Sequence, residues 1–393
     1  MTKKSDAPAI RFKGFSDAWE QRKVQDVADR FDNLRIPVAA NLRVHGTTPY
    51  YGANGIQDYV EGFTHDGEFV LVAEDGANDL KNYPVKCVNG RIWVNNHAHV
   101  LQGKAGISDN SFLAFAISQS DIESLLVGGS RAKLNAETLM SIEFKLPCLQ
   151  EQYRIGEYLT QLDHLITLHQ RKFEKLTNVK KSMLEKMFPQ NGSSYPEIRF
   201  KGFTDPWEQR KLGDIADIVG GGTPSTGNQS YWDGDIDWYA PAEIADQIYA
   251  NSSQKKITGL GYENSSAKML PPGTVLFTSR AGIGKTAILT RKGCTNQGFQ
   301  SIVPHRGELD SYFIFSRTGE LKRYGELVGA GSTFVEVSGK QMAVMELMMP
   351  PTMREQQTIG GFFQQLDHLI TLHQRELEKL QNIKKSMLEK MFV

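Results

Sequence analysis

The sequence of 393 residues has few cysteines, no excess of either charge and no long hydrophobic segment. Its cysteines, Cys87, Cys148 and Cys294, are too widely spaced for a zinc site or a disulfide framework, which indicates a reducing compartment. No apolar run approaches the ~20 residues that a membrane helix requires, and the polar start Met1–Asp6 has no signal-peptide core. We therefore expect a cytoplasmic protein that has no membrane segment.

The charge balance also argues against one class of protein. Lysine and arginine total 45, aspartate and glutamate total 45, and the formal net charge is zero. A protein that simply coats DNA is usually basic. Any DNA binding must therefore come from local patches or be shared with a basic partner.

Catalytic motifs are absent or incomplete. The segment 279–286 ends like a P-loop, but Ser279 stands where that motif needs glycine, and 287–290 is typical of a strand rather than a helix. The segment Glu143-Phe-Lys145 matches the tail of a nuclease motif without a convincing upstream Pro-Asp. No Asn-Pro-Pro-aromatic motif of an amino-methyltransferase occurs. This pattern favours binding over catalysis.

Metal ligands are equally sparse. The pair His97-x-His99 has no obvious third ligand, so we expect no metal site there. Asp233, Asp235 and Asp237 lie near turn residues and are interpreted as turn formers.

The chain is a duplication. Residues 8–24 return at 196–212, and residues 151–188 return at 355–392 with ten differences in 38 positions. The middles, roughly 25–150 and 213–350, show little resemblance to each other. A unit duplicated in this way tends to pack about a pseudo-two-fold axis, as an isologous dimer does. We expect the repeated helices to be antiparallel and the variable regions to lie at opposite ends.

Each long repeat has the apolar spacing of a coiled-coil helix, in alternating steps of four and three residues. His169, His373, Lys180 and Lys384 are the polar exceptions, interpreted as register control, with partner contact as the alternative. The predicted seam contains Leu159, Leu162, Ile166, Leu176, Phe363, Leu366, Ile370 and Leu380.

The variable regions mix short β-like runs with turn signals at Asn54-Gly55, Asp75-Gly76 and Asn89-Gly90. Loops that carry amide, hydroxyl and basic side chains can reach base edges. The candidate DNA-binding residues are Tyr50, Asn54, Lys81, Arg91, Thr223, Ser225, Thr278, Ser279, Arg280 and Lys285. The alternative for any one of them is an ordinary place in a β-rich loop.

Taken together, these features resemble a known family, the specificity subunits of type I restriction-modification enzymes. The resemblance covers essentially the whole chain. Its most specific element is the helix start, Pro147 to Glu151-Gln152 followed by Leu162-Asp163, which recurs from Pro350 to Asp367. Segments 49–56, 71–76, 222–225 and 277–285 add to it. Cys148 and Thr352 depart from the more usual Pro-hydrophobic sequence at this point.

The resemblance implies an α+β fold with two pseudo-two-fold-related α/β target-recognition domains separated by a long antiparallel two-helix coiled coil. The expected divisions are a first recognition domain at 1–150, a helix at 151–188, a linker and short block at 189–205, a second recognition domain at 206–350, and a helix at 351–393.

The family further implies a non-catalytic subunit that reads a bipartite asymmetric site in double-stranded DNA. It would dock two modification subunits and, in some complexes, restriction subunits. No cofactor is expected on this chain, with S-adenosylmethionine, ATP and magnesium expected on partner subunits. The remaining alternatives are a coiled-coil scaffold without DNA binding and a stand-alone P-loop or nuclease enzyme.

Overall fold

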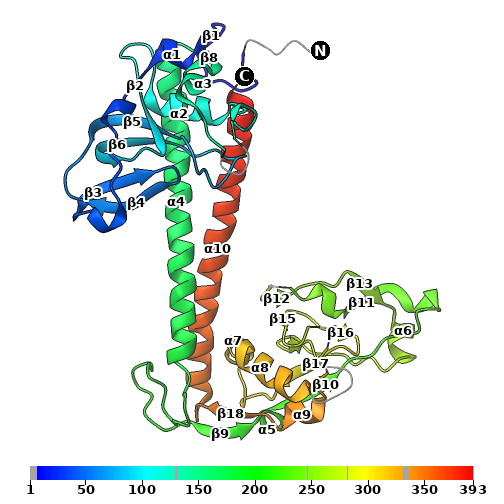
Figure 1. Ribbon diagram of the computed structural model, residues 1–393. Helices are drawn as coiled ribbons and strands as arrows, with labels where there is room; N and C mark the ends of the chain where they lie inside the picture. The colour runs from blue at the N-terminus through cyan, green and yellow to red at the C-terminus, as the bar shows by residue number, and fades with distance from the viewer. Residues whose placement is uncertain (1–6, 129–131, 246, 281, 331–335, 393) are drawn as a thin grey trace. The chain divides into compact units, whose positions relative to one another are not determined.

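A computed structural model describes residues 7–128, 132–245, 247–280, 282–330 and 336–392 (Figure 1). The polar start Met1–Asp6 lies outside these ranges. The chain divides into two compact units, Met1–Arg171 with Gln374–Val393, and Lys172–His373. Each unit therefore contains one variable region and part of each long helix, whereas the sequence divisions treat each long helix as a segment of its own.

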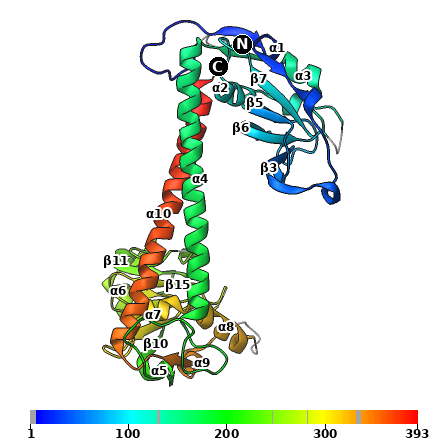
Figure 2. The same cartoon turned by 90° about the vertical axis from the view of Figure 1, so that its left-hand side faces the viewer.

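The first unit is built on a sheet that has six strands within the described residues. In sheet order these are β2 (Ala28–Arg30), β7 (Ala98–Gly103), β5 (His65–Ala73), β6 (Val85–Val94), β3 (His45–Gly52) and β4 (Gly55–Val60). Strand β1 (Glu20–Lys23) pairs separately with β8 (Glu143–Leu146). The α-helices are α1 (Val24–Val27), α2 (Asn110–Ser118), α3 (Ala136–Ser141) and the start of α4 (Leu149–Lys186). Helix α2 packs against β5 and β6 (Figure 2).

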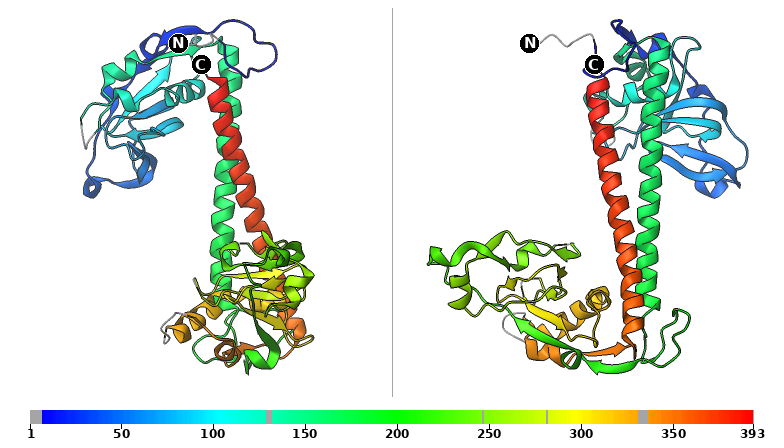
Figure 3. Two further views of the ribbon diagram at one scale, coloured as in Figure 1. Left: turned by 90° about the vertical axis from the view of Figure 1, so that its right-hand side faces the viewer. Right: turned by 180° about the vertical axis from the view of Figure 1, so that it is seen from behind.

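The second unit repeats the plan with two smaller sheets among its described residues. One has the order β10 (Ala216–Gly220), β17 (Gln300–Pro304), β14 (Val275–Phe277), β15 (Thr286–Leu289) and β12 (Tyr249–Ala250). The other has β13 (Lys255–Ile257), β11 (Trp232–Tyr239) and β16 (Cys294–Thr295), and β9 (Glu208–Lys211) pairs with β18 (Glu346–Met349). The α-helices are α5 (Leu212–Ile215), α6 (Gly259–Glu263), α7 (Ser311–Ser316), α8 (Thr318–Gly329), α9 (Gly339–Ala343) and the start of α10 (Met353–Met391), which are labelled in Figure 1 and coloured alike in Figure 3.

A buried carboxylate near the start of each long helix fixes the repeated short block. Glu151 is fully buried and accepts two hydrogen bonds from Arg11, at 2.8 and 2.7 Å, and one from the Trp19 indole at 3.2 Å. The hydrogen bonds that Arg11 donates to Glu151 raise the pKa of the Arg11 guanidinium. The second copy repeats these contacts with Arg199, Trp207 and Glu355.

The next residue connects each helix to the variable region. The Gln152 side chain accepts from the backbone of Asp109 at 3.0 Å and donates to the carbonyls of Ile107 and Pro147. Gln356 likewise accepts from Asp310 and donates to Glu308. The Glu-Gln pair thus gives the helix start two partners, the short block through Glu and the variable region through Gln.

The long helices pack antiparallel within each unit. In the first unit the start of α4 shares a core with the end of α10, where Leu159 and Leu162 meet Leu380, Ile383 and Met387. In the second unit the end of α4 and the start of α10 form the equivalent core. Of the seam residues, Leu159, Leu162, Phe363 and Leu366 are buried, and Ile166, Leu176, Ile370 and Leu380 are partly buried.

Two ion pairs join the helices at equivalent places. Lys384 of α10 lies 2.5 Å from Asp163 of α4 in the first unit, and Lys180 lies 2.5 Å from Asp367 in the second. The polar seam residues Lys180 and Lys384 therefore meet the aspartates of the two Leu-Asp motifs. A seven-residue slip would separate both pairs, so they favour one register.

The predicted turn at Asn89-Gly90 is wrong, because both residues lie inside β6. Gly90 has a φ of +94° and pairs across the sheet with Gly67, whose φ is +139°. Two facing glycines allow the strands to bend without a turn.

Adjacent glycines of α10 give a matched test of this packing. A Cβ on Gly360 would lie 2.6 Å from Asp310 Oδ1 and 3.0 Å from the Phe313 backbone nitrogen, whereas a Cβ on Gly361 would meet nothing within 4 Å. Gly360→Ala should destabilise the chain by about 1–3 kcal/mol through overpacking. Gly361→Ala should stabilise it by up to ~1 kcal/mol through helix propensity. Chemical denaturation measures both, and equal effects would contradict the packing described.

Candidate nucleic-acid interface

Three loops of the second unit leave the same edge of its larger sheet. Gly220 at the end of β10 pairs with Gln300 at the start of β17, and Phe277 at the end of β14 pairs with Thr286 at the start of β15. The loops after β10, after β14 and before β17 therefore meet at this edge. The backbone of Ser279 donates to Gly298 at 2.8 Å, which ties two of them together.

All of the predicted binding residues of the second unit lie on these loops. Lys285 and Ser225 are exposed, while Arg280 and Thr223 are partly exposed. The Thr223 hydroxyl donates to the side chain of Gln297 on the third loop. The edge thus brings together hydroxyl, carboxamide and cationic groups that were distant in the sequence.

Thr278 and Ser279 are buried, so the prediction that they contact DNA directly is corrected. The Thr278 hydroxyl donates to the carbonyl of Gly282 at 2.7 Å and accepts from the backbone of Lys285 at 3.0 Å. These bonds shape the loop that presents Arg280 and Lys285.

Two tryptophans hold the glycine-rich loop in place. The Trp238 indole donates to the carbonyl of Gly222 at 2.8 Å, and the Trp232 indole donates to Ser225 at 3.1 Å. The rings meet edge to face with centroids 5.1 Å apart. Asp237 on the same strand is buried and pairs with Arg291 at 2.6 Å, so its interpretation as a turn former is wrong.

In the first unit, Asn54 joins two loops. Its side chain donates to the carbonyl of Gly76 at 2.9 Å and accepts from the backbone of Asn78 at 2.9 Å. Tyr50 is 1% exposed, and its hydroxyl is hydrogen-bonded to the backbone of Val38. Burial makes Tyr50 a core residue and corrects the prediction of a direct DNA contact.

The other two candidates of the first unit lie elsewhere on its surface. Arg91 on β6 has a 66% exposed side chain, which lies 3.3 Å from Asp66 and over the Phe63 ring. Lys81 is exposed on the segment after β5, where its backbone donates to Asp79. The structure therefore gathers the second unit's candidates more closely than those of the first.

Sequence reasoning missed a loop frame common to both units. Asn95 donates through its backbone to the carbonyl of Tyr51 at 3.1 Å, and its side chain accepts from the backbone of His97 at 2.8 Å. In the second unit the same two bonds have lengths of 3.0 and 2.7 Å and are made by Asn296 to Tyr239 and Gly298. The available signal was an asparagine three residues before β7 in the first variable region and four residues before β17 in the second.

The residue at the apex of this frame is exposed in each unit, and it is Asn96 in the first and Gln297 in the second. Both are carboxamides, the side chains that can make paired hydrogen bonds with adenine. The frame therefore presents the same chemical group from two unrelated sequences.

The first unit contains a network of buried and partly buried charged residues around Glu74 and Asp32. Glu74 lies 2.6 Å from Arg35 and 2.8 Å from Lys133, and Asp32 lies 2.7 Å from His99. Burial raises the pKa of Glu74, but hydrogen bonds from Lys133 and Arg35 outweigh it and leave the pKa lowered. Burial also opposes the shift at Asp32, whose pKa is lowered by hydrogen bonds from His99 and Val100.

The described residues give the alternative activities little support. Thr286 begins strand β15 where a P-loop would begin a helix, although Ala281 of that segment lies outside the described ranges. Glu143 of the nuclease-like segment is hydrogen-bonded to Gln21 on the paired strand. In the described ranges no group of three or more His, Cys, Asp or Glu residues could hold a metal ion.

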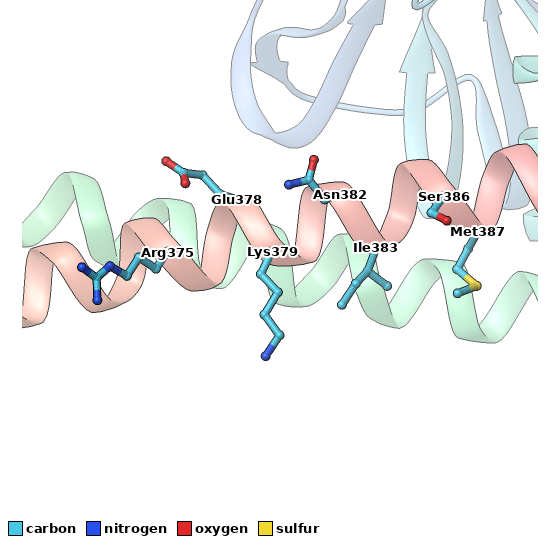
Figure 4. Close-up of a pocket in the computed structure, with 7 residues that line it drawn as sticks. All are labelled: Arg375, Glu378, Lys379, Asn382, Ile383, Ser386 and Met387. Atoms are coloured by element: carbon cyan, nitrogen blue, oxygen red, sulfur yellow. The ribbon is translucent and has the colours of Figure 1, made fainter. Parts of the chain in front are cut away.

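A hollow on α10 is also unlike an active site. It is lined by Arg375, Glu378, Lys379, Asn382, Ile383, Ser386 and Met387 (Figure 4). All of its lining comes from one helix, so it does not enclose a ligand as a binding cleft does. In the part of the chain that the structure describes, no helix is both long and apolar enough to span a membrane.

The fold repeats one plan in two units, and each unit carries the same asparagine frame. The sequence matches the model of the type I restriction modification DNA specificity domain at residues 16–178 and again at 204–382. These matches cover most of the chain, which therefore belongs to the type I restriction-modification DNA specificity family.

Individual relatives agree with this assignment. A putative type I restriction enzyme specificity subunit from Haemophilus influenzae is 44% identical over 146 residues, which are 37% of this chain and 38% of the relative. A type I restriction enzyme specificity subunit from Methanocaldococcus jannaschii is 34% identical over 190 residues, 48% of this chain and 44% of the relative. These matches span less than half the length of either relative.

A solved structure is similar along nearly the whole chain. The S subunit of a type I restriction-modification system from M. genitalium aligns with a TM-score of 0.68 and 13% identity, covering 98% of this chain and 99% of that one. At this identity the likeness shows the fold alone. It confirms the expected mixed fold of two repeated domains and long helices.

The Glu74 network predicts an acid-sensitive first unit. Because the folded-state pKa values of Glu74 and Asp32 are lowered, their stabilisation is complete above the unfolded-state values near 4.5 and 3.8 and is lost as the pH falls through the folded-state values. Glu74→Gln should lower stability at pH 7 and weaken its fall below about pH 4.5. Denaturant unfolding between pH 7 and pH 3 measures this, with exposed Glu61→Gln as the control. An unchanged acid dependence in Glu74→Gln would contradict the network.

Proposed function

We propose that the chain reads a two-part site in double-stranded DNA through the loop edges of its two recognition domains. The observation that carries this proposal is the loop frame made by Asn95 in one unit and by Asn296 in the other. The frame is the same in both units, but the loop residues around it differ because the two variable regions are dissimilar. Different loop residues on one framework suit the reading of two different half-sites. The bipartite site is then asymmetric.

The chemistry of the loops supports DNA as the ligand. Arg280 and Lys285 can donate to guanine edges, and carboxamides at the apices suit adenine. Phosphate contacts would position the duplex and base contacts would specify the sequence. Because the net charge of the chain is zero, we propose that partner subunits share the phosphate contacts.

The repeated parts of the chain are proposed to dock two modification subunits. Residues 8–24 and 196–212 are close copies, and each is held to a long helix by the same buried Arg–Glu–Trp contact. Two equal surfaces suit two copies of one partner. Restriction subunits complete the proposed complex, with S-adenosylmethionine, ATP and magnesium on the partners, and this chain serves binding rather than catalysis.

Replacing one recognition region tests the proposal. Residues 25–145 are exchanged for the same region of a relative, and methylated adenines are mapped in cells that also express the modification subunit. One half of the methylated site should change, while the half read by residues 213–350 stays the same. Changes in both halves would show that the regions are not independent readers, and no methylated motif with either chain would favour a scaffold without DNA binding.

We further propose that helix length sets the gap between half-sites. Deleting Ile166–Lys172 and Ile370–Glu376 together removes one heptad from each helix and keeps the phase of the seam. Each deletion falls between the Asp and the Lys of its helix, so both ion pairs can form again in one register. Each helix shortens by about 10.5 Å at ~1.5 Å per residue, or roughly three base pairs.

The spacer within methylated sites is the readout for this double deletion. It should shorten by about three base pairs, although the rotation of about 100° between half-sites weakens binding. Deleting one heptad from a single helix is the control, because it puts the two ion pairs out of register and should disrupt the helix pairing. An unchanged spacer in an active double-deletion complex would rule out the helices as the ruler.

A further inference from the structure

The two recognition domains carry opposite charges at one equivalent position. The backbone of Glu74 donates to His97 at 2.9 Å and its carbonyl accepts from Leu134 at 2.7 Å. Ser279 makes the same two contacts with Gly298 at 2.8 Å and Val337 at 3.0 Å. Glu74 and Ser279 are therefore equivalent, and so are the residues that follow them, Asp75 and Arg280.

The residues that face this position are reversed as well. Asp75 forms an antiparallel bridge with Lys133, whereas Arg280 forms the same bridge with Glu336. Each bridge sets opposite charges across two backbones, an arrangement that stabilises pairing. The backbone geometry is thus the same in both domains, but the first domain carries a hydrogen-bond acceptor at this position and the second carries a hydrogen-bond donor.

In each domain the charged side chain, Asp75 or Arg280, lies beside the exposed apex residue of the asparagine frame. Asp75 accepts a hydrogen bond from the ring of His97, the residue after Asn96. A Cβ built on Gly298, the residue after Gln297, would be 3.5 Å from Nε of Arg280. Asp75 and His97 keep exposed side-chain fractions of 29% and 43%, so a ligand can reach this position.

We infer that Asp75 and Arg280 are equivalent specificity-determining residues, one an acceptor and the other a donor. The inference rests on the proposed function. Arg280 would donate to O6 and N7 of a guanine in one half-site, and Asp75 would accept from the N4 amino group of a cytosine in the other. Asn96 and Gln297 supply the neighbouring base contact in their own half-sites.

The test uses the full chain in complex with its modification subunits and a random library of double-stranded DNA. Bound DNA is sequenced, and affinities are measured for the selected site and its single-base variants. Arg280→Gln should weaken the preference for guanine at one position of one half-site by about 5- to 150-fold, and Asp75→Asn should do the same for cytosine in the other half-site. Each variant should leave the opposite half-site unchanged.

Controls are exposed residues of the same charge away from the edge. The first control is Asp29→Asn, because Asp29 lies on β2 and pairs with the far end of β7. The second control is Arg306→Gln, because Arg306 follows the far end of β17. Both should retain the wild-type motif. Should Asp75→Asn fail to fold, Asn96→Ala must alter the same half-site.

Three results would overturn the inference. The first is a folded Asp75→Asn or Arg280→Gln complex with wild-type base preferences, and the second is a variant that alters both half-sites. The third is an Asn96→Ala complex whose base preferences are unchanged in the half-site that the first domain reads. If instead the wild-type complex selects no two-part motif, the proposed function itself fails and the inference fails with it.

Discussion

The buried carboxylate at the start of each long helix is the contact on which the scaffold depends. Glu151 and Glu355 are almost completely inaccessible, and each accepts hydrogen bonds from an arginine and a tryptophan indole of a short block that lies 132 to 156 residues earlier in the chain. Removing one partner of such a buried pair leaves a charge without compensation and costs several kcal/mol. The neighbouring glutamine then anchors the recognition domain to the same helical turn. A short sequence, Glu-Gln, thereby joins helix, block and domain.

The helix pair adds a second constraint, which acts on register. An apolar seam alone permits slips of a heptad, because leucine and isoleucine recur every seven residues. The Asp163–Lys384 and Asp367–Lys180 pairs distinguish the correct alignment. Both helices carry the aspartate and the lysine 17 residues apart, so one sequence pattern serves both directions of the pairing.

Much of this architecture could be predicted from the sequence. Repeats and seven-residue periodicity are local patterns, so the duplication and the long helices were accessible. Which loop residues are buried could not be predicted, because burial depends on contacts between distant segments of the chain. Thr278 and Ser279 look like loop hydroxyls next to a strand, yet they lie under the turn that exposes Lys285. Tyr50 looked accessible beside flexible glycines, but its hydroxyl is engaged by Val38. The frame of Asn95 and Asn296 was hidden because the regions around it share almost no sequence.

That asparagine frame separates two tasks that loops usually combine. Its hydrogen bonds come from backbone groups and from the first asparagine, and the side chain of the following residue makes neither of them. A substitution at residue 96 or 297 therefore alters the chemistry offered to a ligand while the two bonds that define the loop remain. Under the proposed function, one substitution at such a position would change the base that is read while the backbone of the loop stays fixed.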